Sequence, residues 1–380
     1  MINSVNFNEV VDFLEGPGVR KWQFRDSGIK LINIRNLVES KLDLSNTNKH
    51  LDESEVSQKY SHFLLKNGDY VMASSGVTWG KIAEVKEEHL PLCLNTSIIK
   101  LKPKNNNLEK RFLWHFIKAR EFRRQIDRII TGSAQPNFGP SHLHKISIPL
   151  PPLEQQKKIA AILDAADAYR QKTKALIEKY DELTQSLFLD MFGDPVGNPK
   201  GWESSKLGLI VENKDSKRKP VKSSDRENMD GDYPYYGASG IIDYVNWFTH
   251  EGDNLLIGED GANLLARSKP IAFIAKGQYW VNNHAHVLGF NGKALLVFIE
   301  FFINLIDLSN YVTGSAQPKL NRKNMDQIKI FCPPIELQNQ FADSVKAIEA
   351  QKAQAQESLA KAEDLFNSLL QKAFKGELTS

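Results

Sequence analysis

Two stretches of the chain carry hydrophobic residues at the alternating spacing of three and four that marks the seam of a long helix. In the first stretch, which begins near Ile159, these positions are Ile162, Ala166, Tyr169, Thr173, Leu176, Tyr180, Leu183 and Leu187. In the second stretch, they are Phe341, Val345, Ile348, Ala355, Leu359, Ala362, Phe366, Leu369 and Ala373. Such seams are typical of coiled coils, so we predict two long helices.

Proline and glycine mark the ends of the first helix. Pro151 and Pro152 fix its start, because proline is tolerated only at or before the first helical turn, and Gly193 to Pro195 fix its end. A helix from Glu154 to Phe192 would be about 58 Å long at about 1.5 Å per residue. A helix of that length needs a partner, so we predict that the two helices pair antiparallel. The alternative is two separate surface helices.

The segments before the two helices are expected to be globular. Short runs of strand-like composition, separated by Gly, Asn and Pro, predict a small curved sheet at Ile29 to Ile34, Tyr70 to Ala73, Lys81 to Val85 and Thr96 to Leu101. An apolar helix is expected to close each globular segment, at Leu108 to Arg128 and at Ala294 to Ile306.

The chain repeats itself. The hexapeptide TGSAQP occurs at Thr131 to Pro136 and again at Thr313 to Pro318, an offset of 182 (313 − 131). The same offset carries Pro151 to Pro333 and Gln156 to Gln338 without a gap. Upstream the similarity is weak, between NGDYVMASSGVTWGKIA from Asn67 and EGDNLLIGEDGANLLAR from Glu251. One part of each half is therefore a common scaffold, and the other part has diverged.

The expected fold class is α+β, with two globular domains alternating with two long helices in a pseudo-two-fold internal repeat. The predicted domains are residues 1–150, a central helix at 151–194, residues 195–332 and a C-terminal helix at 333–380. The turn NPKGW, from Asn198 to Trp202, suits the start of the second globular domain.

The composition narrows the class of protein without identifying a partner. With 41% hydrophobic and 25% charged residues, the chain reads as an ordinary globule, and a net charge of +3 is too small to indicate a ligand. Cys93 and Cys332 are the only cysteines, which excludes a disulfide framework and a cysteine-built zinc site. No apolar run suggests a membrane span or a secretion signal, so we expect a cytoplasmic protein.

Catalytic and metal-binding motifs are mostly missing. The sequence contains no GxxxxGK[ST] or GxGxxG phosphate-binding motif. The pairs His284 with His286, and His142 with His144, lack a third metal ligand, so we expect their imidazoles to form hydrogen bonds internally or to base edges. Glu259 and Asp260 resemble a pair of catalytic acids, but the other half has serines near the matching place.

Two basic clusters favour binding to nucleic acid. The first interleaves Trp114, His115 and Phe122 with the cations Lys110, Arg111, Lys118, Arg120, Arg123, Arg124 and Arg128. This combination suits phosphate contact, although the arginines would also fit a solvated face opposite buried Phe112, Phe116 and Ile126. The second cluster is KDSKRKPVK, from Lys214 to Lys222, followed by Tyr233, Tyr235 and Tyr236.

Taken together, these motifs resemble the specificity subunits of type I restriction-modification systems over nearly the whole chain. The resemblance rests on TGSAQP, on PPLEQQKKIAAIL from Pro151 and PPIELQNQF from Pro333, and on further motifs in the globular segments. Those further motifs are GPGVRKW from Gly16, LINIRNL from Leu31, SSGVTWGKIA from Ser74, GASG from Gly237, GEDGA from Gly258 and VNNHAHVL from Val281. Leu337 departs from the family pattern, which has Gln there.

The resemblance implies that two target-recognition domains read a bipartite, asymmetric DNA site and are held apart by the helix pair. It also implies two methyltransferase subunits and motor-nuclease restriction subunits as partners. The chain itself is expected to be non-catalytic and to bind no cofactor, with S-adenosylmethionine on the methyltransferase subunits. Two alternatives remain: a free-standing DNA-binding regulator that dimerises through its helices, and a structural coiled-coil adaptor.

Polar residues in the loops of the globular segments are the candidate readers of base edges. In the first domain the candidate DNA-binding residues are Ser74, Ser75, Thr78, Trp79, Lys81, Asn95, Arg123 and Arg124. In the second they are Tyr236, Ser239, Glu259, Asp260, Asn263, His284 and His286. Gln135 and Gln317, in the repeated hexapeptide, are expected to be structural because both copies agree.

Overall fold

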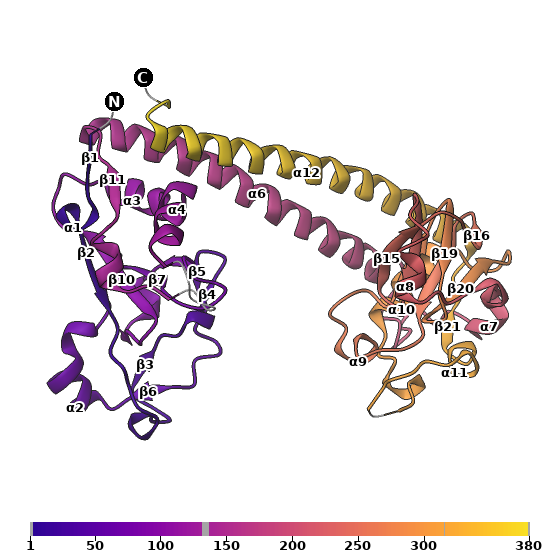
Figure 1. Ribbon diagram of the computed structural model, residues 1–380. Helices are drawn as coiled ribbons and strands as arrows, with labels where there is room; N and C mark the ends of the chain where they lie inside the picture. Colours follow the sequence, from indigo (N-terminus) through magenta and orange to yellow (C-terminus); the bar gives the residue numbers. More distant parts are fainter. Residues whose placement is uncertain (1–2, 131–136, 315, 379–380) are drawn as a thin grey trace. The chain divides into compact units, whose positions relative to one another are not determined.

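The computed structural model describes residues 3–130, 137–314 and 316–378 (Figure 1). Contacts divide the chain into two compact units. Unit 1 contains Met1–Lys174 and Glu357–Ser380, and unit 2 contains Ala175–Gln356. Helices α6 (Leu153–Phe192) and α12 (Ile335–Lys375) each contribute one part to both units. We call the part of each unit outside these two helices its globule.

The globule of unit 1 is built on a four-stranded antiparallel sheet in the order β2 (Val11–Glu15), β10 (Ile98–Pro103), β7 (Tyr70–Ala73), β8 (Ile82–Glu84). Three smaller pairings are β1 (Ser4–Asn6) with β11 (Ser147–Pro149), β4 (Leu37–Val38) with β5 (Lys41–Leu42), and β3 (Ile29–Leu31) between β6 (His50–Leu51) and β9 (Leu92–Cys93). Its helices are α1 (Phe7–Val10), α2 (Glu53–Glu55), α3 (Lys110–Lys118), α4 (Arg120–Ile129) and α5 (Pro140–Leu143).

The globule of unit 2 has two four-stranded sheets. The first has the order β13 (Val211–Asn213), β20 (Ala285–Phe290), β17 (Asn254–Gly258), β18 (Ala272–Ala275). The second has the order β15 (Gly240–Val245), β14 (Tyr233–Gly237), β19 (Gln278–Val281), β16 (His250–Glu251), and β12 (Ser204–Lys206) pairs with β21 (Lys329–Phe331). Its helices are α7 (Leu207–Ile210), α8 (Ser223–Arg226), α9 (Asn263–Ala266), α10 (Leu296–Leu305) and α11 (Arg322–Asp326).

The main sheets of the two globules share one topology, which confirms the internal repeat. In both, the first long strand pairs with the fourth, and the hairpin β7–β8 in unit 1 corresponds to β17–β18 in unit 2. A short strand that enters each globule pairs with the strand leading to a long helix, as β1 with β11 and β12 with β21. The weak upstream sequence similarity therefore reflects a common fold.

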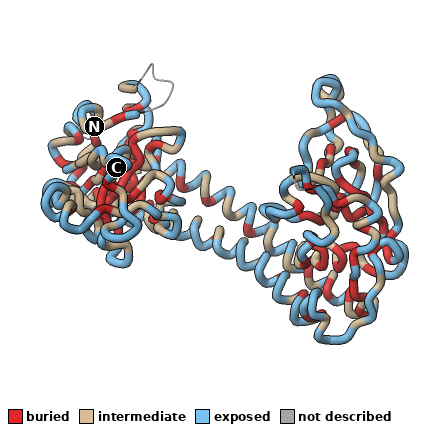
Figure 2. The backbone as a smooth tube through the Cα atoms, turned by 90° about the horizontal axis from the view of Figure 1, so that it is seen from below, coloured by how far each residue is buried: buried red, intermediate tan, exposed pale blue. Residues whose placement is uncertain are grey.

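Aromatic side chains from the long helices complete the core of each globule. In unit 1, Phe374 of α12 packs against Phe112 and Phe116, with ring centroids 5.1 and 5.4 Å apart. In unit 2, Phe188 of α6 and Phe341 of α12 pack against each other at 5.5 Å and against α10. Figure 2 shows the buried residues gathered inside each globule. Since fully burying one such side chain is worth about 1.5–3 kcal/mol, the globules and helices stabilise each other.

The long helices pair antiparallel in each unit, as predicted. In unit 1 the N-terminal part of α6 meets the C-terminal part of α12, where the Arg170 guanidinium lies 4.5 Å from the ring centroid of Phe366. In unit 2 the C-terminal part of α6 meets the N-terminal part of α12, where Lys352 forms an ion pair with Asp181. These contacts exclude the alternative of two separate surface helices.

Half of the seam predicted on α6 is wrong. Ala166, Thr173, Tyr180 and Leu187 are buried or half-buried as expected, but Ile162, Tyr169, Leu176 and Leu183 are exposed. The inward positions lie one residue later, at Leu163, Arg170, Ile177 and Thr184. Hydrophobicity alone misplaced them, because Arg170 covers an aromatic ring with its long side chain and the Thr184 hydroxyl donates to the Tyr180 carbonyl oxygen.

A buried glutamine fixes each globule to a long helix, which explains why this part of the repeat is shared. The side-chain oxygen of Gln156 accepts from the Glu109 N–H, at the start of α3, and its amide donates to the Pro151 carbonyl oxygen, both at 2.8 Å. Gln338 makes the equivalent bonds, from the Leu295 N–H before α10 and to the Pro333 carbonyl oxygen. Each glutamine therefore satisfies a backbone donor at a helix start that has no partner within the helix.

Candidate nucleic-acid interface

The loops that follow β7 and β17 occupy the same place in the two globules. The Phe138 N–H donates to the Ser74 carbonyl oxygen at 3.0 Å, and the Leu320 N–H donates to the Glu259 carbonyl oxygen at 2.7 Å. The next residues, Ser75 and Asp260, form matching β-bridges with Asn137 and Lys319. The segment just after each TGSAQP copy therefore holds this loop, and Ser74 corresponds to Glu259.

A second loop lies beside the first in both globules. The Ser74 N–H donates to the Ser97 carbonyl oxygen at 2.9 Å, and the Glu259 N–H donates to the His284 carbonyl oxygen at 2.8 Å. Ser97 therefore corresponds to His284. Sequence reasoning missed Ser97, although the strings LNTS and VNNH end on these two residues and offered a signal.

In unit 1 the structure brings four of the predicted residues into one groove of about 500 Å³. Thr78, Trp79, Lys81 and Arg123 line it, together with residues of α3 and α4. Trp79 is buried against the Phe138 ring at 5.5 Å, and the Arg123 guanidinium lies 4.4 Å from its ring centroid. Lys81 and Arg123 are exposed, so their charges are available to a ligand phosphate.

Two other predicted residues of unit 1 are turned into the protein. Ser74 is fully buried, and its hydroxyl has no hydrogen-bond partner among the described residues. Asn95 is half-buried, with its amide donating to the Asn33 side-chain oxygen at 2.9 Å and its own oxygen accepting from the Thr96 N–H. Ser75 is half-buried.

The basic cluster on α3 neutralises carboxylates within unit 1. Arg111 and Lys118 form ion pairs with Asp164 and Asp167 of α6, and Lys110 pairs with Glu84 at 2.6 Å. Burial acts to raise the pKa of Asp164, but hydrogen bonds from Arg111 and His115 hold it below its usual range. The cations of α3 therefore form ion pairs within the folded unit.

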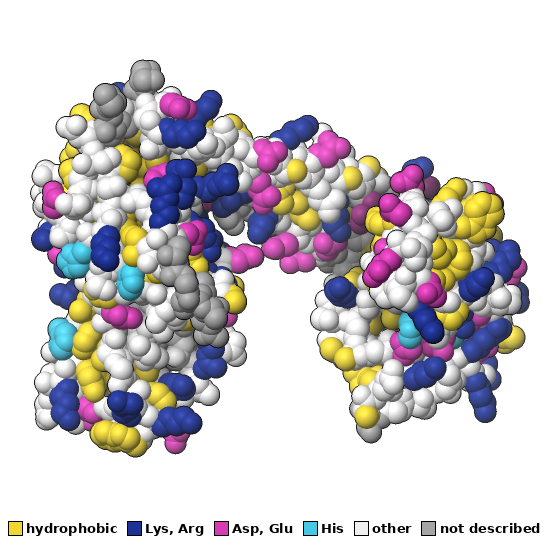
Figure 3. Space-filling view, in the orientation of Figure 1, with side chains coloured by type: hydrophobic (Ala, Val, Ile, Leu, Met, Phe, Trp, Pro, Cys, Tyr) yellow, Lys and Arg dark blue, Asp and Glu magenta, His cyan; other side chains and the backbone are white. Residues whose placement is uncertain are grey.

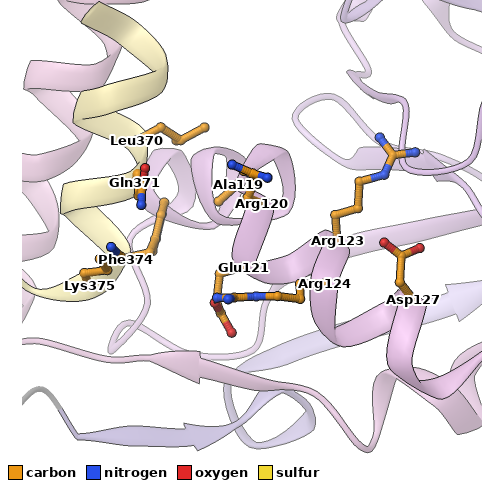
Figure 4. A pocket seen from close by; sticks show the side chains of 10 residues that line it. All are labelled: Ala119, Arg120, Glu121, Arg123, Arg124, Asp127, Leu370, Gln371, Phe374 and Lys375. Atoms are coloured by element: carbon orange, nitrogen blue, oxygen red, sulfur yellow. The ribbon is translucent and has the colours of Figure 1, made fainter. Parts of the chain in front are cut away.

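Helix α4 carries the exposed part of the cluster. Arg120, Arg123, Arg124 and Arg128 are exposed, and only Arg124 has an ion-pair partner there among the described residues, namely Glu121. Arg120 and Arg124 line a groove of about 530 Å³ between α4 and the last turns of α12, with Lys375 on the opposite side (Figure 4). Figure 3 shows Lys and Arg side chains gathered on this part of unit 1. Unit 2 has no helix equivalent to α4 in its described part.

In unit 2 the most accessible of the predicted residues are Ser239 and His284. The His284 side chain is 48% exposed, and its Nδ1 lies 3.0 and 2.8 Å from the two carboxylate oxygens of Asp260. Tyr236 is half-buried and stacks on Phe273, with ring centroids 5.8 Å apart. The side chain of Asn263 forms hydrogen bonds within its own loop. Its oxygen accepts from the Lys269 N–H at 3.0 Å, and its amide donates to the Lys269 carbonyl oxygen.

A buried charge network lies beneath the loops of unit 2. His286 is buried, with Nδ1 2.7 Å from the Asp215 carboxylate and Nε2 2.9 Å from the Leu320 carbonyl oxygen. Arg218 donates to the Glu259 carboxylate at 2.6 Å and also pairs with Asp215. Burial acts to raise the pKa of Glu259 and of Asp215, but the Arg218 bond to Glu259 and the His286 bond to Asp215 hold both below their usual values.

The second basic cluster contributes residues to this network. Arg218 comes from the Lys214 to Lys222 segment, and Lys319, which follows the second TGSAQP copy, lies 3.3 Å from the Glu259 carboxylate. Sequence reasoning missed the roles of Asp215 and Arg218. The network therefore joins the basic segment, the loop after β17 and the segment that follows the second hexapeptide.

The histidine pairs do not come together as metal sites. Among residues 3–130, 137–314 and 316–378, no group of three His, Cys, Asp or Glu side chains could hold a metal ion. His142 accepts from the Gly139 N–H at 3.1 Å, and His144 packs on Phe13. The first TGSAQP copy, with Gln135, lies outside the described residues. At the second copy, the Thr313 N–H donates to the Lys319 carbonyl oxygen at 2.9 Å in an isolated β-bridge. No helix in the described part of the chain is long and apolar enough to span a membrane.

Comparison with curated proteins found relatives that match parts of the chain or most of it. It is 39% identical over 135 residues to the putative type I restriction enzyme specificity subunit S.HindORF215P of Haemophilus influenzae, which covers 35% of this chain and 34% of that protein. It is 30% identical over 191 residues to the type I restriction enzyme MjaVIII specificity subunit of Methanocaldococcus jannaschii. This match covers 49% of this chain and 44% of that protein. The chain thus spans less than half the length of these two relatives. The chain is also 25% identical over 372 residues to the putative type I restriction enzyme MjaX specificity subunit of M. jannaschii. This match covers 90% of the chain and 86% of that protein.

The fold is shared with solved structures. The crystal structure of a type I restriction-modification S subunit from M. genitalium superimposes with a TM-score of 0.59 at 18% identity, covering 98% of this chain and 96% of that one. The model of the type I restriction modification DNA specificity domain matches residues 3–180 and again residues 199–363. With two successive matches over most of its length, the chain belongs to the type I restriction modification DNA specificity domain family.

Proposed function

We propose that this chain reads a bipartite, asymmetric DNA sequence, one part with each globule, as the specificity subunit of a type I restriction-modification system. The observation that carries the proposal is the repeated fold with diverged loops: two equivalent scaffolds present different side chains at the same places. A protein that reads two different half-sites needs this combination, because base edges in the major groove differ in their donors and acceptors.

The candidates that are exposed, or half-buried with a polar end that has no hydrogen-bond partner among the described residues, are proposed to contact DNA directly. In the first globule these are Ser75, Thr78, Lys81, Arg123 and Arg124, and in the second they are Tyr236, Ser239 and His284. For the remaining candidates Ser74, Trp79, Asn95, Glu259, Asp260, Asn263 and His286, we propose a supporting role, because their side chains pack or hydrogen-bond within the protein. The cations of α4 are suited to phosphate contact, which fixes register without reading sequence.

The long helices are proposed to set the distance between the half-sites and to hold two methyltransferase subunits, with restriction subunits joining the complex. In each unit, the large apolar side chains that α6 leaves exposed include two that are seven residues apart: Ile162 and Tyr169 in unit 1, Leu176 and Leu183 in unit 2. Residues seven apart lie on one face of a helix, and exposed apolar faces favour a protein partner.

The chain is proposed to act in the cytoplasm, to catalyse no reaction and to bind no cofactor, with S-adenosylmethionine held by the methyltransferase subunits. Methylation of DNA by the purified chain alone would contradict this proposal. A free-standing regulator is not favoured, since the matched relatives are specificity subunits. Co-purification separates the two, because a regulator would bind its site without a methyltransferase.

Mapping methylated adenines across a genome, with and without this chain, tests the function. We expect a two-part motif that appears only when the chain is present together with its methyltransferase subunits. Removing one facing heptad from each long helix shortens the pair by about 10 Å, which is about three base pairs. An unchanged spacer between the two parts of the motif would overturn the role of the helices, and no motif at all would overturn the function.

A further inference from the structure

His284 of unit 2 is exposed and is paired with Asp260, whose side chain is only 15% exposed. The Asp260 carboxylate can only accept, so the Nδ1 atom of His284, 2.8 Å away, must donate its proton to it. The backbone N–H of His284 donates to the Asn282 side-chain oxygen at 2.8 Å. Both the backbone and the ring of His284 are therefore fixed, while its side chain stays 48% exposed.

This arrangement leaves Nε2 as the outward hydrogen-bonding atom of the ring. The contacts of His284 within the described residues all involve Nδ1 or the backbone. An imidazole whose second nitrogen is fixed by a carboxylate presents one hydrogen-bonding direction at a defined angle. That is the requirement for discriminating base edges, since discrimination depends on geometry that a wrong base cannot satisfy.

The network beneath the pair supplies the rigidity. Glu259 precedes Asp260, and its carboxylate is bonded by Arg218 at 2.6 Å and lies 3.3 Å from Lys319. His286 lies two residues after His284, within β20, and is anchored to Asp215 and to the Leu320 carbonyl oxygen. Asp260 directly follows Glu259, and His284 lies two residues before His286, so both members of the pair are close in sequence to residues held in the buried network.

The first globule has Ser75 where the second has Asp260, and Ser97 where the second has His284. This correspondence follows from the matched β-bridges and the matched backbone hydrogen bonds of the two loops. Both serines are half-buried. The same two positions therefore carry short hydroxyl groups in one globule and a long, oriented imidazole in the other.

We propose that these two equivalent positions determine specificity: the His284–Asp260 pair reads a base edge through Nε2 in the second half-site, with Asp260 as its positioning residue, and Ser75 with Ser97 takes the same place in the first. The proposal rests on the proposed function and deepens it. It assigns one base pair of each half-site to one pair of positions, and it makes those positions exchangeable between globules.

The test is selection of bound sequences from a random double-stranded DNA library, using the full chain with its methyltransferase subunits. His284→Ala is expected to reduce discrimination at one base pair of one half-site by about tenfold to a hundredfold, and to leave the other half-site unchanged. Asp260→Ala is expected to give a smaller loss at the same base pair, with binding to non-specific DNA and its salt dependence unchanged. His62→Ala removes another exposed imidazole and serves as the matched control.

The double variant Ser75→Asp with Ser97→His places the pair in the first globule. Ser97 has a φ of +67°, which His284 does not share, but histidine is enriched in that left-handed region relative to most residues, so the backbone at Ser97 can accept it. We expect a changed preference at one base pair of the other half-site. Unaltered preferences in both His284→Ala and the double variant would overturn the inference while the bipartite site remains, whereas loss of any site in the unmodified chain would overturn the function as well.

Discussion

The two globules place the same strand positions in opposite environments. Ile99 pairs with Met72 in unit 1, and His286 pairs with Ile257 at the equivalent place in unit 2. Ser74, a buried hydroxyl without a partner among the described residues, corresponds to Glu259, a carboxylate held by Arg218. One scaffold therefore tolerates an apolar layer in one copy and a charge network in the other.

The difference shows which contacts the scaffold requires. The glutamines that join globule and helix are the same in both units, whereas the layer beneath the loops is not. Backbone hydrogen bonds hold the loop in both globules. The Phe138 N–H donates to the Ser74 carbonyl oxygen, and the Leu320 N–H donates to the Glu259 carbonyl oxygen. Side chains in this layer are thus free to diverge with the target, provided that each buried charge keeps its partners.

The charge network predicts the largest effect. Asp215→Ala leaves the buried His286 without its carboxylate partner and Arg218 with Glu259 alone, and breaking a buried pair costs about 3–5 kcal/mol. We expect unit 2 to lose that much stability and unit 1 to lose none. Hydrogen exchange can separate the units: amides of β20 should lose protection while amides of β10 keep it. Equal loss in both strands would show that the two units do not unfold separately.

The glutamines test what the units share. Gln156→Ala and Gln338→Ala each remove the acceptor for a backbone N–H at a helix start, which costs about 1–3 kcal/mol when the group is buried. We expect nearly equal destabilisation in the two units, measured by hydrogen exchange at α3 and α10. A clearly larger effect in one unit would mean that the repeat conserves the residue without conserving its contribution.

A carboxylate on α10 makes unit 2 sensitive to pH. Burial, with Glu349 as a second cause, raises the pKa of Glu300 to about 7. The folded state therefore holds this proton more tightly than the unfolded state, so stability should fall as pH rises from about 4.5 to about 7. Glu300→Gln should remove this slope and stabilise unit 2 above pH 7 by about 1–3 kcal/mol. Urea unfolding at several pH values measures this, and a slope that persists in the variant would assign it to another group.

The sequence predicted the repeat and the helix pair because both follow from regular spacing and from exact duplication. It misplaced half of the α6 seam because spacing does not reveal that an arginine covers a ring while Tyr169 faces outward. The candidate loops were found, but the roles within them were not. His286 and Asp215 are 71 residues apart in the chain, and only folding brings them together.

The smallest predicted effect is at Ser74, and the corresponding substitution in the second globule should have the opposite sign. Ser74→Ala removes a buried hydroxyl that has no partner among the described residues, so unit 1 should be unchanged or more stable by up to about 1 kcal/mol. Glu259→Ala, at the corresponding position, leaves Arg218 without its closest carboxylate and should destabilise unit 2. Thermal unfolding of the two variants side by side measures the difference. If Ser74→Ala were instead destabilising, its hydroxyl would have a partner outside the described residues, and the layer in unit 1 would be polar like that in unit 2.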